Sequence, residues 1–436
     1  MRTFTALCTL LATPLLALAQ DVKRPNILIV LSDDQSARIE GCYGNKDVRT
    51  PNIDKLAAKG LRLDRYYVTT PQCVPSRASL MAGRSPIDIQ MTRFSAPLPR
   101  DVKVFPEILR AAGYFAGVAG RTYHLDGAAV NAVSSQVLDQ QGLKTFPTRL
   151  DYVKTAGQRE QMIAQFTEFL SLVPKGKPFV LQLCFSDPHR PLDKTGVHDP
   201  AKITLPMFFP DTPAVRADFA RYLDEVNRFD TDVGTILEEL QRRGLLDNTL
   251  VIVSSDNGGA LFRGKGTLYD LGVHVPFVVH WSGHTPQGKS SAALVSGEDL
   301  APTLLEAAGV GVPREMTGRS FLPLLSNPEK PGFSKKPGFW DYKPRLYVFC
   351  QRGAHGSGLP TNTAAFDLSR CVISERYKLI YNALPHLPYH PVDFAGDAMW
   401  LELKEMHKSG KLAPMLTKLY FDTPRPMYEL YDLQDD

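Results

Sequence analysis

Three short apolar runs, each followed directly by serine and aspartate, place the strongest constraint on how this chain folds. Short runs rich in Val, Ile and Leu, with little polar alternation, are typical of strands covered on both faces of a sheet. The runs and the polar clusters that end them are 26–31 with Ser32-Asp33-Asp34, 179–185 with Ser186-Asp187-Pro188-His189, and 249–254 with Ser255-Asp256-Asn257-Gly258. We expect three central strands, each with polar side chains at its carboxyl end.

Amphipathic helices are expected between these strands. The clearest covers residues 214–243, where apolar side chains recur at three- and four-residue steps. Alternating strands and helices predict an α/β architecture, a large, mixed, mostly parallel sheet sandwiched by helices. Ligands of such sheets gather beyond the carboxyl ends of the strands. The three polar clusters should therefore meet at one edge of the sheet.

The sequence changes character beyond about Pro344. Short strand-like runs separated by turn residues replace the longer alternation, and one more helix is expected. The runs are 345–351, 371–375 and 377–383, and the helix is 399–406. A segment rich in Pro, Lys and Gly, residues 328–338, is the predicted linker. We expect a large domain over residues 20–340 and a smaller α+β domain with an antiparallel sheet over residues 341–436.

The first 19 residues have the features of a secretory signal peptide. Arg2 precedes an apolar stretch, and Ala17-Leu18-Ala19 provides a small-residue cleavage pattern. No later stretch is long and apolar enough to span a bilayer, so we expect an exported chain without a membrane segment after cleavage. The formal net charge of +4 is too small to indicate a nucleic-acid partner.

Five cysteines would remain after cleavage of the leader. They are Cys42, Cys73, Cys184, Cys350 and Cys371. An odd number in an oxidising compartment leaves at least one thiol free or modified, and Cys73 is our candidate. Cys350 and Cys371 are candidates for a disulfide, but the sequence does not decide the pairing.

Cys73 lies at the predicted start of a short helix. Pro75 is favoured in a first turn, residues 76–82 suit a helix, and Gly83 is placed to end it. The free N–H groups and positive dipole end of a helix start stabilise anions, and Arg77 adds a fixed positive charge there. A lone cysteine in this position is more often a buried structural residue.

Asp33, Asp34, Asp256 and Asn257 are candidate metal ligands. Three carboxylates and one amide oxygen, without His or thiolate, suit a hard cation such as calcium or magnesium rather than zinc. A single Asp or Asn after a strand is commonly a turn former. Two such clusters at equivalent strand ends favour the metal interpretation.

The run Cys-Val-Pro-Ser-Arg over residues 73–77, followed by Ala-Ser-Leu-Met-Ala-Gly-Arg, resembles the signature of the sulfatase family. The resemblance implies an alkaline phosphatase-like fold and oxidation of Cys73 to formylglycine by a maturation enzyme. One hydroxyl of the hydrated aldehyde would attack sulfur, and the other would later expel the sulfate. The ligands implied for one calcium ion, preferred over magnesium, are Asp33, Asp34, Asp256, Asn257 and the modified residue 73.

Further residues receive catalytic roles from the same resemblance, together with Cys73 and Arg77. Arg121 stands where sulfatases usually have Lys, and the two side chains differ in hydrogen-bond geometry. His124 would bind the nucleophile's hydroxyl and act as a base. His189 would bind sulfate or protonate the leaving atom. Lys265, on a glycine-rich loop, would bring its ammonium close to the sulfate. Taken alone, His124 and Lys265 would be ordinary exposed loop residues.

The resemblance covers nearly the whole chain after the leader and implies a sulfated carbohydrate as substrate. Segments that look most like heparan N-sulfatases are 187–190, 205–251, 377–382 and 428–431. Segments that also resemble iduronate sulfatases are 33–35, 41–44 and 122–124. The loop around Lys265 resembles the general glycan-sulfatase pattern and not that of heparan N-sulfatases, which have Arg there, so the resemblance implies a sulfated sugar more firmly than an N-sulfate. Residues 428–436 resemble a sulfatase C-terminal motif that normally continues with further residues.

Two other hypotheses stay open. A phosphatase or phosphonate-ester hydrolase of the same superfamily would keep the fold, but most such phosphatases use Ser or Thr and bind zinc through several His. A glycan-binding protein with an inactive site would still bind carbohydrate after Cys73→Ala, and its parent would release no sulfate. The pattern around Cys73 favours the sulfatase hypothesis over both.

Overall fold

A computed structural model gives the fold of most of the chain. The residues it describes are 24–94, 97–121, 125, 136–137, 140–143, 146–155, 159–193, 196–326, 343–355 and 361–435. The predicted leader, the predicted linker and His124 lie outside the described residues. The proposed boundary at residue 340 therefore stays a prediction.

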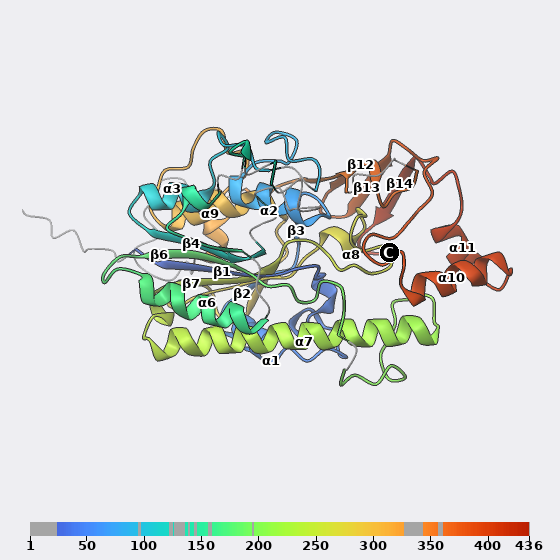
Figure 1. Cartoon of the computed structure of the whole chain (residues 1–436), viewed down its shortest axis with the longest axis horizontal. Helices are drawn as coiled ribbons and strands as arrows, with labels where there is room; N and C mark the ends of the chain where they lie inside the picture. The colour runs from blue at the N-terminus through green and yellow to red at the C-terminus, as the bar shows by residue number, and fades with distance from the viewer. Residues whose placement is uncertain are drawn as a thin grey trace, which may run out of the picture.

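The centre of the molecule is an eight-stranded sheet with the order β5-β4-β6-β1-β7-β8-β2-β9 (Figure 1). The pairings β4–β5, β4–β6, β1–β6, β1–β7 and β2–β9 are parallel. Only β8, among the described strands of this sheet, runs antiparallel to its neighbours. The strands are β1 Asn26–Ser32, β2 Leu61–Leu63, β4 Phe115–Gly120, β5 Tyr152–Thr155, β6 Phe179–Cys184, β7 Thr249–Ser255, β8 Phe277–Trp281 and β9 Lys289–Ser291. The predicted mixed, mostly parallel sheet is confirmed.

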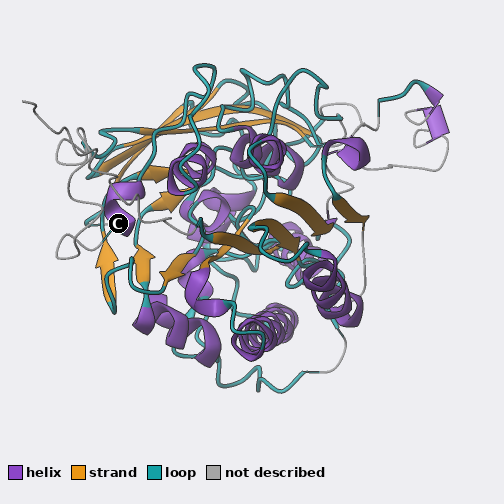
Figure 2. Cartoon of the chain, turned by 90° about the vertical axis from the view of Figure 1, so that its left-hand side faces the viewer, coloured by secondary structure: helices purple, strands orange, loops and turns teal. Residues whose placement is uncertain are grey.

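Helices cover both faces of this sheet, as Figure 2 shows in a view from one end. In Figure 1, α1, α6 and α7 lie below the sheet, and α2, α3 and α9 lie above it. The α-helices are α1 Pro51–Lys59, α2 Cys73–Ala82, α3 Phe105–Ala111, α5 Phe146–Arg149, α6 Arg159–Leu172, α7 Pro213–Arg242, α8 Asp270–Val273, α9 Leu300–Ala307, α10 Ala398–Lys408 and α11 Pro414–Tyr420. Short 3-10 helices are η1 Ala37–Ile39, η2 Gly41–Tyr43, η4 Leu246–Asn248, η5 Gly297–Asp299 and η6 Leu322–Leu325.

The central strand β1 explains why both faces are covered. Its residues are all buried, and alternate side chains of a strand point to opposite faces. Ile27, Ile29 and Leu31 belong to the core beneath α2, α3 and α9, whereas Leu28 and Val30 belong to the core shared with α6 and α7. A strand apolar on both faces is therefore held between two cores, as its sequence predicts.

The other predicted elements are confirmed with small shifts of their ends. The helix expected over 214–243 is α7, and the strand runs at 179–185 and 249–254 are β6 and β7. The expected short helix after Cys73 is α2, which Gly83 ends in the left-handed conformation at φ 64°. None of the described helices is long and apolar enough to cross a membrane.

The C-terminal region forms the predicted antiparallel sheet, in the order β11-β12-β13-β14. Its strands are β11 Val348–Ala354, β12 Phe366–Ile373, β13 Tyr377–Asn382 and β14 Tyr428–Asp432; a separate two-stranded sheet pairs β3 Tyr66–Tyr67 with β10 Val295–Ser296. The inner face of the four-stranded sheet joins the core above the central sheet. A third apolar cluster joins α10 and α11 to the first half of α7. Cys350 and Cys371 face each other across β11 and β12 as free thiols.

Candidate active site

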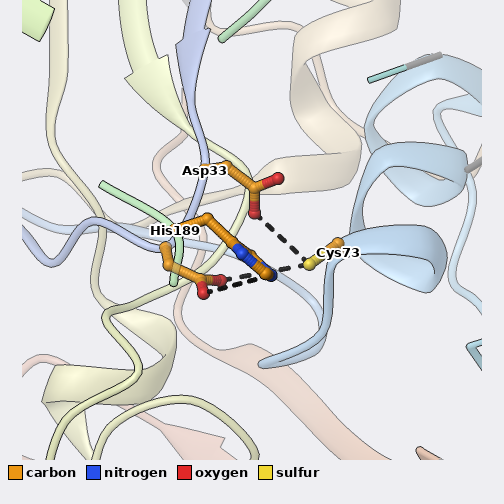
Figure 3. Close-up of side chains that lie close together, drawn as sticks. Asp33, Cys73 and His189 are labelled. Carbon is orange, nitrogen blue, oxygen red and sulfur yellow. Dashed lines mark hydrogen bonds and ion pairs between the residues drawn. The ribbon is translucent and has the colours of Figure 1, made fainter. Parts of the chain in front are cut away.

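Cys73 is the first residue of α2 and is completely buried. Its sulfur lies 3.4 Å from Asp33 Oδ1 and 3.9 Å from Asp34 Oδ1. Figure 3 shows the sulfur pointing from the start of the helix toward the Asp33 carboxylate, with His189 beside them. The strand end after β1 and the N-terminus of α2 therefore meet at this thiol. Burial and the Asp33 carboxylate raise the pKa of the unmodified thiol well above its usual value.

The second polar cluster, after β7, joins the same centre. The Asp34 backbone N–H donates to Asp256 Oδ1 at 3.2 Å, and Asn257 Nδ2 donates to Asp34 Oδ1 at 2.7 Å. Asp34 has a left-handed φ of 68°, which Asp tolerates better than most residues. Its carbonyl accepts a 2.6 Å hydrogen bond from the Tyr222 hydroxyl of α7. The parallel pairing of β1 with β7 thus brings the four predicted ligands together.

Three cations surround these carboxylates. Arg77 Nη2 lies 2.9 Å from Asp256 Oδ2 and 3.4 Å from Asp33 Oδ2. Arg121 Nη1 lies 3.0 Å from Asp33 Oδ2. Lys265 Nζ lies 2.8 Å from Asp34 Oδ1. The structure therefore places these three predicted residues at the centre, and it gives Arg121 a direct contact with a candidate metal ligand.

The third cluster, after β6, contributes a histidine but not its aspartate. His189 Nε2 lies 3.7 Å from Asp34 Oδ2. Burial and Lys265 lower the pKa of His189 to about 4. The Asp187 carboxylate instead contacts Arg228 of α7 at 2.9 Å. The predicted convergence of three strand ends is thus observed, although the Asp187 side chain is used to attach α7.

Burial raises the pKa of each of the three carboxyl groups, and the neighbouring cations lower it. Burial outweighs Lys265 and raises the pKa of Asp34 to about 7, and it outweighs Arg77 and raises the pKa of Asp256 to about 7. Burial acts on Asp33 as well, but Arg121, His189 and Arg77 hold its pKa well below its usual value. A bound divalent cation would favour the ionised form of all three.

The oxygen donors of the centre fit a hard divalent cation. Asp33, Asp34, Cys73 and His189 each place one potential ligand atom within 4.8 Å of the others. Asn257 Oδ1 is buried without a hydrogen-bond partner, which is costly unless a cation or water satisfies it. Carboxylate and amide oxygens are typical calcium ligands. Three of the predicted ligands, Asp33, Asp34 and Cys73, thus lie close enough to share one ion, and Asp256 and Asn257 stay predicted ligands.

The C-terminal region adds two residues that the sequence did not identify. Asp393 Oδ2 lies 2.6 Å from Lys265 Nζ and 3.6 Å from His189 Nε2. His355 Nε2 lies 3.6 Å from Asp393 Oδ1, and its Nδ1 lies 3.1 Å from Nε2 of Gln72, the residue before Cys73. His355 directly follows β11, so the rule applied to the other strand ends could have indicated it. No comparable pattern surrounds Asp393 in its turn-rich segment.

A cleft of about 650 Å³ lies beside the centre. Its lining includes His189, Arg190, Asp218, Asp393, Asp397 and Met399. The cleft thus runs from the histidine over α7 to the start of α10. Pockets of this size hold small-molecule ligands.

Comparison with known proteins identifies the family to which this chain belongs. The sulfatase family model matches residues 25–310. Human N-sulphoglucosamine sulphohydrolase is 31% identical over 463 residues, covering 94% of this chain and 84% of that protein. The site lies at the carboxyl edge of a mostly parallel sheet, where ligands of such sheets bind. The chain belongs to the sulfatase family, whose members hydrolyse sulfate esters.

Solved structures share the fold at lower identity. A phosphonate monoester hydrolase from Silicibacter pomeroyi has a TM-score of 0.67 and 20% identity, with 90% of this chain and 97% of that chain covered. A protein solved with its substrate D-glucosamine-2-N,6-O-disulfate has a TM-score of 0.62 and 20% identity, with 92% and 99% covered. These likenesses support the alkaline phosphatase-like architecture of the two packed regions.

Proposed function

We propose that this sulfatase removes sulfate from a sulfated carbohydrate, with Cys73 matured to formylglycine and one calcium ion bound beside it. The observation that carries the proposal is the position of Cys73 at the start of α2, 3.4 Å from Asp33 and inside a ring of buried carboxylates and cations. Formylglycine, once formed, would supply a hydroxyl nucleophile for attack on sulfur. Calcium would supply positive charge to a sulfate oxygen.

The cations of the centre stabilise charge on the sulfate. Lys265 carries a pKa raised well above its usual value, because Asp34 and other anions outweigh the effect of burial, so it stays an ammonium. Arg77 stays charged beside Asp256 and Asp33 for the same reason. Preorganised donors of this kind stabilise the transition state without reorganising, and removing one typically costs roughly 3 kcal/mol of barrier.

His189 is the proposed proton donor to the leaving atom. Its Nδ1 faces the Arg190 carbonyl at 2.5 Å, and a carbonyl can only accept, so Nδ1 carries a proton. The proton transferred would therefore come from Nε2, on the side of the cleft. With a pKa of about 4 the free ring is neutral near pH 7 and Nε2 is unprotonated, so His189 donates only after a bound sulfate raises this pKa against burial and Lys265.

The carbohydrate is proposed from the relatives. The human relative that is 31% identical acts on N-sulphoglucosamine by its name, and a structural neighbour was solved with a glucosamine disulfate as its substrate. We propose N-sulfated glucosamine as the first substrate to test. We also propose export, which the features of residues 1–19 support, and maturation by a formylglycine-generating enzyme.

A matured protein and a panel of substrates test this proposal. The full chain is produced with a formylglycine-generating enzyme, and mass spectrometry of the peptide that contains residue 73 should show the aldehyde. Sulfate release is then measured from defined heparan, chondroitin and algal oligosaccharides, with Cys73→Ala as the control. A matured protein that releases no sulfate from any of them, or that hydrolyses a phosphonate or phosphate ester faster, contradicts the proposal.

A further inference from the structure

We propose that Asp393 selects the substrate by accepting hydrogen bonds from the sugar, favouring a ring whose carbon next to the sulfated one bears a hydroxyl rather than a second sulfate. The inference deepens the proposed function, on which it rests. It assigns to the C-terminal region a specificity-determining carboxylate at the edge of the catalytic centre.

Asp393 lies beside the atoms that the proposed function places at the reacting group. Its Oδ2 is 3.6 Å from His189 Nε2, the atom placed at the leaving group, and 2.6 Å from Lys265 Nζ. The side chain is 26% exposed, and the residue lines the cleft beside His189. A carboxylate offers about four acceptor positions. Lys265, His189 and His355 therefore leave it with acceptor capacity toward the cleft.

The backbone and its neighbours hold this carboxylate in place. Asp393 adopts a left-handed φ of 69°, a conformation that costs energy in most residues other than Gly and that clusters at functional sites. His355 Nε2 contacts its Oδ1 at 3.6 Å. Phe394, the next residue, is buried in the apolar cluster that joins α10 and α11 to α7. The orientation of Asp393 toward the centre is thus fixed from both sides.

The remaining charges of the cleft do not favour a second anionic group. Arg190 contacts Asp218 at 2.8 Å and Asp397 at 2.9 Å. Arg221 contacts Asp218 at 3.7 Å. Each arginine that lines the cleft therefore already faces a carboxylate, while Asp393 adds negative charge. A second sulfate on the ring would meet this charge, whereas a hydroxyl would donate to it.

Binding to an inactive protein tests the selection separately from catalysis. Calorimetry with Cys73→Ala protein in excess calcium compares D-glucosamine 2-N-sulfate with its 2-N,3-O-disulfate, and N-acetylgalactosamine 4-sulfate with its 3,4-disulfate. We expect a monosulfate to bind at least tenfold more tightly than its disulfate. Adding Asp393→Asn should reduce this ratio to less than threefold, mainly through tighter binding of the disulfate.

A second variant and a control complete the experiment. Asp393→Gly suits the left-handed backbone and should give the same result if the Asn variant fails to fold. Asp422→Asn removes an exposed carboxylate of the same region and should keep the parent ratio. An unchanged ratio in both Asp393 variants, or no binding of either monosulfate, overturns the inference. A matured parent without turnover contradicts the proposed function instead, even where the binding ratio holds.

Discussion

The active site is assembled from two regions that differ in burial. Asp33, Asp256 and Cys73, at the strand ends and the start of α2, have no exposed surface. His355 and Asp393, from the C-terminal region, keep side-chain exposures of 15% and 26%. Under the proposed function, the buried set would meet the sulfate group, which the substrates of a sulfatase share. The partly exposed set would meet the sugar, which varies among substrates.

This difference indicates how one fold serves many substrates. The strand-end residues are fixed by the sheet, because parallel pairing of β1 with both β6 and β7 places three strand ends together. The C-terminal residues lie outside the central sheet, on segments that pack against it. Variation of loops on a rigid scaffold changes recognition without disturbing the chemistry. Four predictions test this division of roles.

The largest effect is expected from removal of the nucleophile. Cys73→Ala should reduce kcat by at least about 10⁴-fold, since the remaining groups cannot form the covalent bond. The substrate should still bind, because the cations and the Asp393 cleft are unchanged. Sulfate release and calorimetric binding measure the two properties. Cys42→Ala, which removes a half-buried thiol outside the centre, should keep full turnover; measurable turnover in Cys73→Ala would contradict the assignment.

Calcium should stabilise the folded protein through the buried region and not through the C-terminal region. Saturating calcium at about 100 times its Kd should stabilise the protein by roughly 2.7 kcal/mol, and chelation should abolish turnover. Asp256→Asn should lose most of both effects, because it removes a carboxylate from the ligand set. Asp393→Asn should keep the calcium-dependent rise in Tm. Thermal unfolding with and without calcium measures the contrast, and equal losses in both variants would remove the distinction between the regions.

The buried region of the site is well predicted from the sequence, because its residues lie next to strands and a helix that short sequence patterns indicate. Asp33, Asp34, Asp256 and Asn257 follow recognisable apolar strands, and the carboxyl ends of parallel strands share one edge of a sheet. The helix at Cys73 has a Pro in its first turn and a Gly at its end. The family resemblance then supplied Arg77, Arg121 and Lys265, which the structure places within 3.5 Å of these carboxylates.

The C-terminal contribution could not be predicted in the same way. The three predicted strands and the predicted helix were confirmed with shifted ends, whereas β14 and α11 were not predicted. No local rule states where the loops of this region face in the folded protein. Asp393 reaches Lys265 only because Phe394, Trp400 and the first half of α7 share one apolar cluster. Asp187 shows the converse, since its position after β6 predicts a site residue while tertiary packing pairs it with Arg228.

Lys265 joins the two regions, and its loss should have an intermediate effect. Lys265→Met keeps the length of the side chain and removes the ammonium that contacts Asp34 and Asp393. We expect kcat to fall by roughly 10²- to 10³-fold, as for removal of one preorganised donor. Lys289→Met, an exposed lysine of β9, should keep wild-type turnover. A change in KM alone would show that Lys265 contributes to substrate binding and not to transition-state stabilisation.

His355 should have the smallest effect, and the effect should appear in selection rather than in rate. Its ring packs 5.0 Å from that of Phe94 and bridges Gln72 to Asp393, and burial lowers its pKa to about 4, so the imidazole is neutral near pH 7. His355→Ala would release the Asp393 carboxylate from one of its supports. We expect KM to rise about tenfold, comparable to the loss of one hydrogen bond to a charged group, with kcat within about twofold of the parent value.

The preference for monosulfated over disulfated sugars should fall as well in His355→Ala, which a purely structural role would not cause. A fall in kcat with unchanged KM and preference would instead place His355 with the buried catalytic set, through its contact with Gln72 beside Cys73.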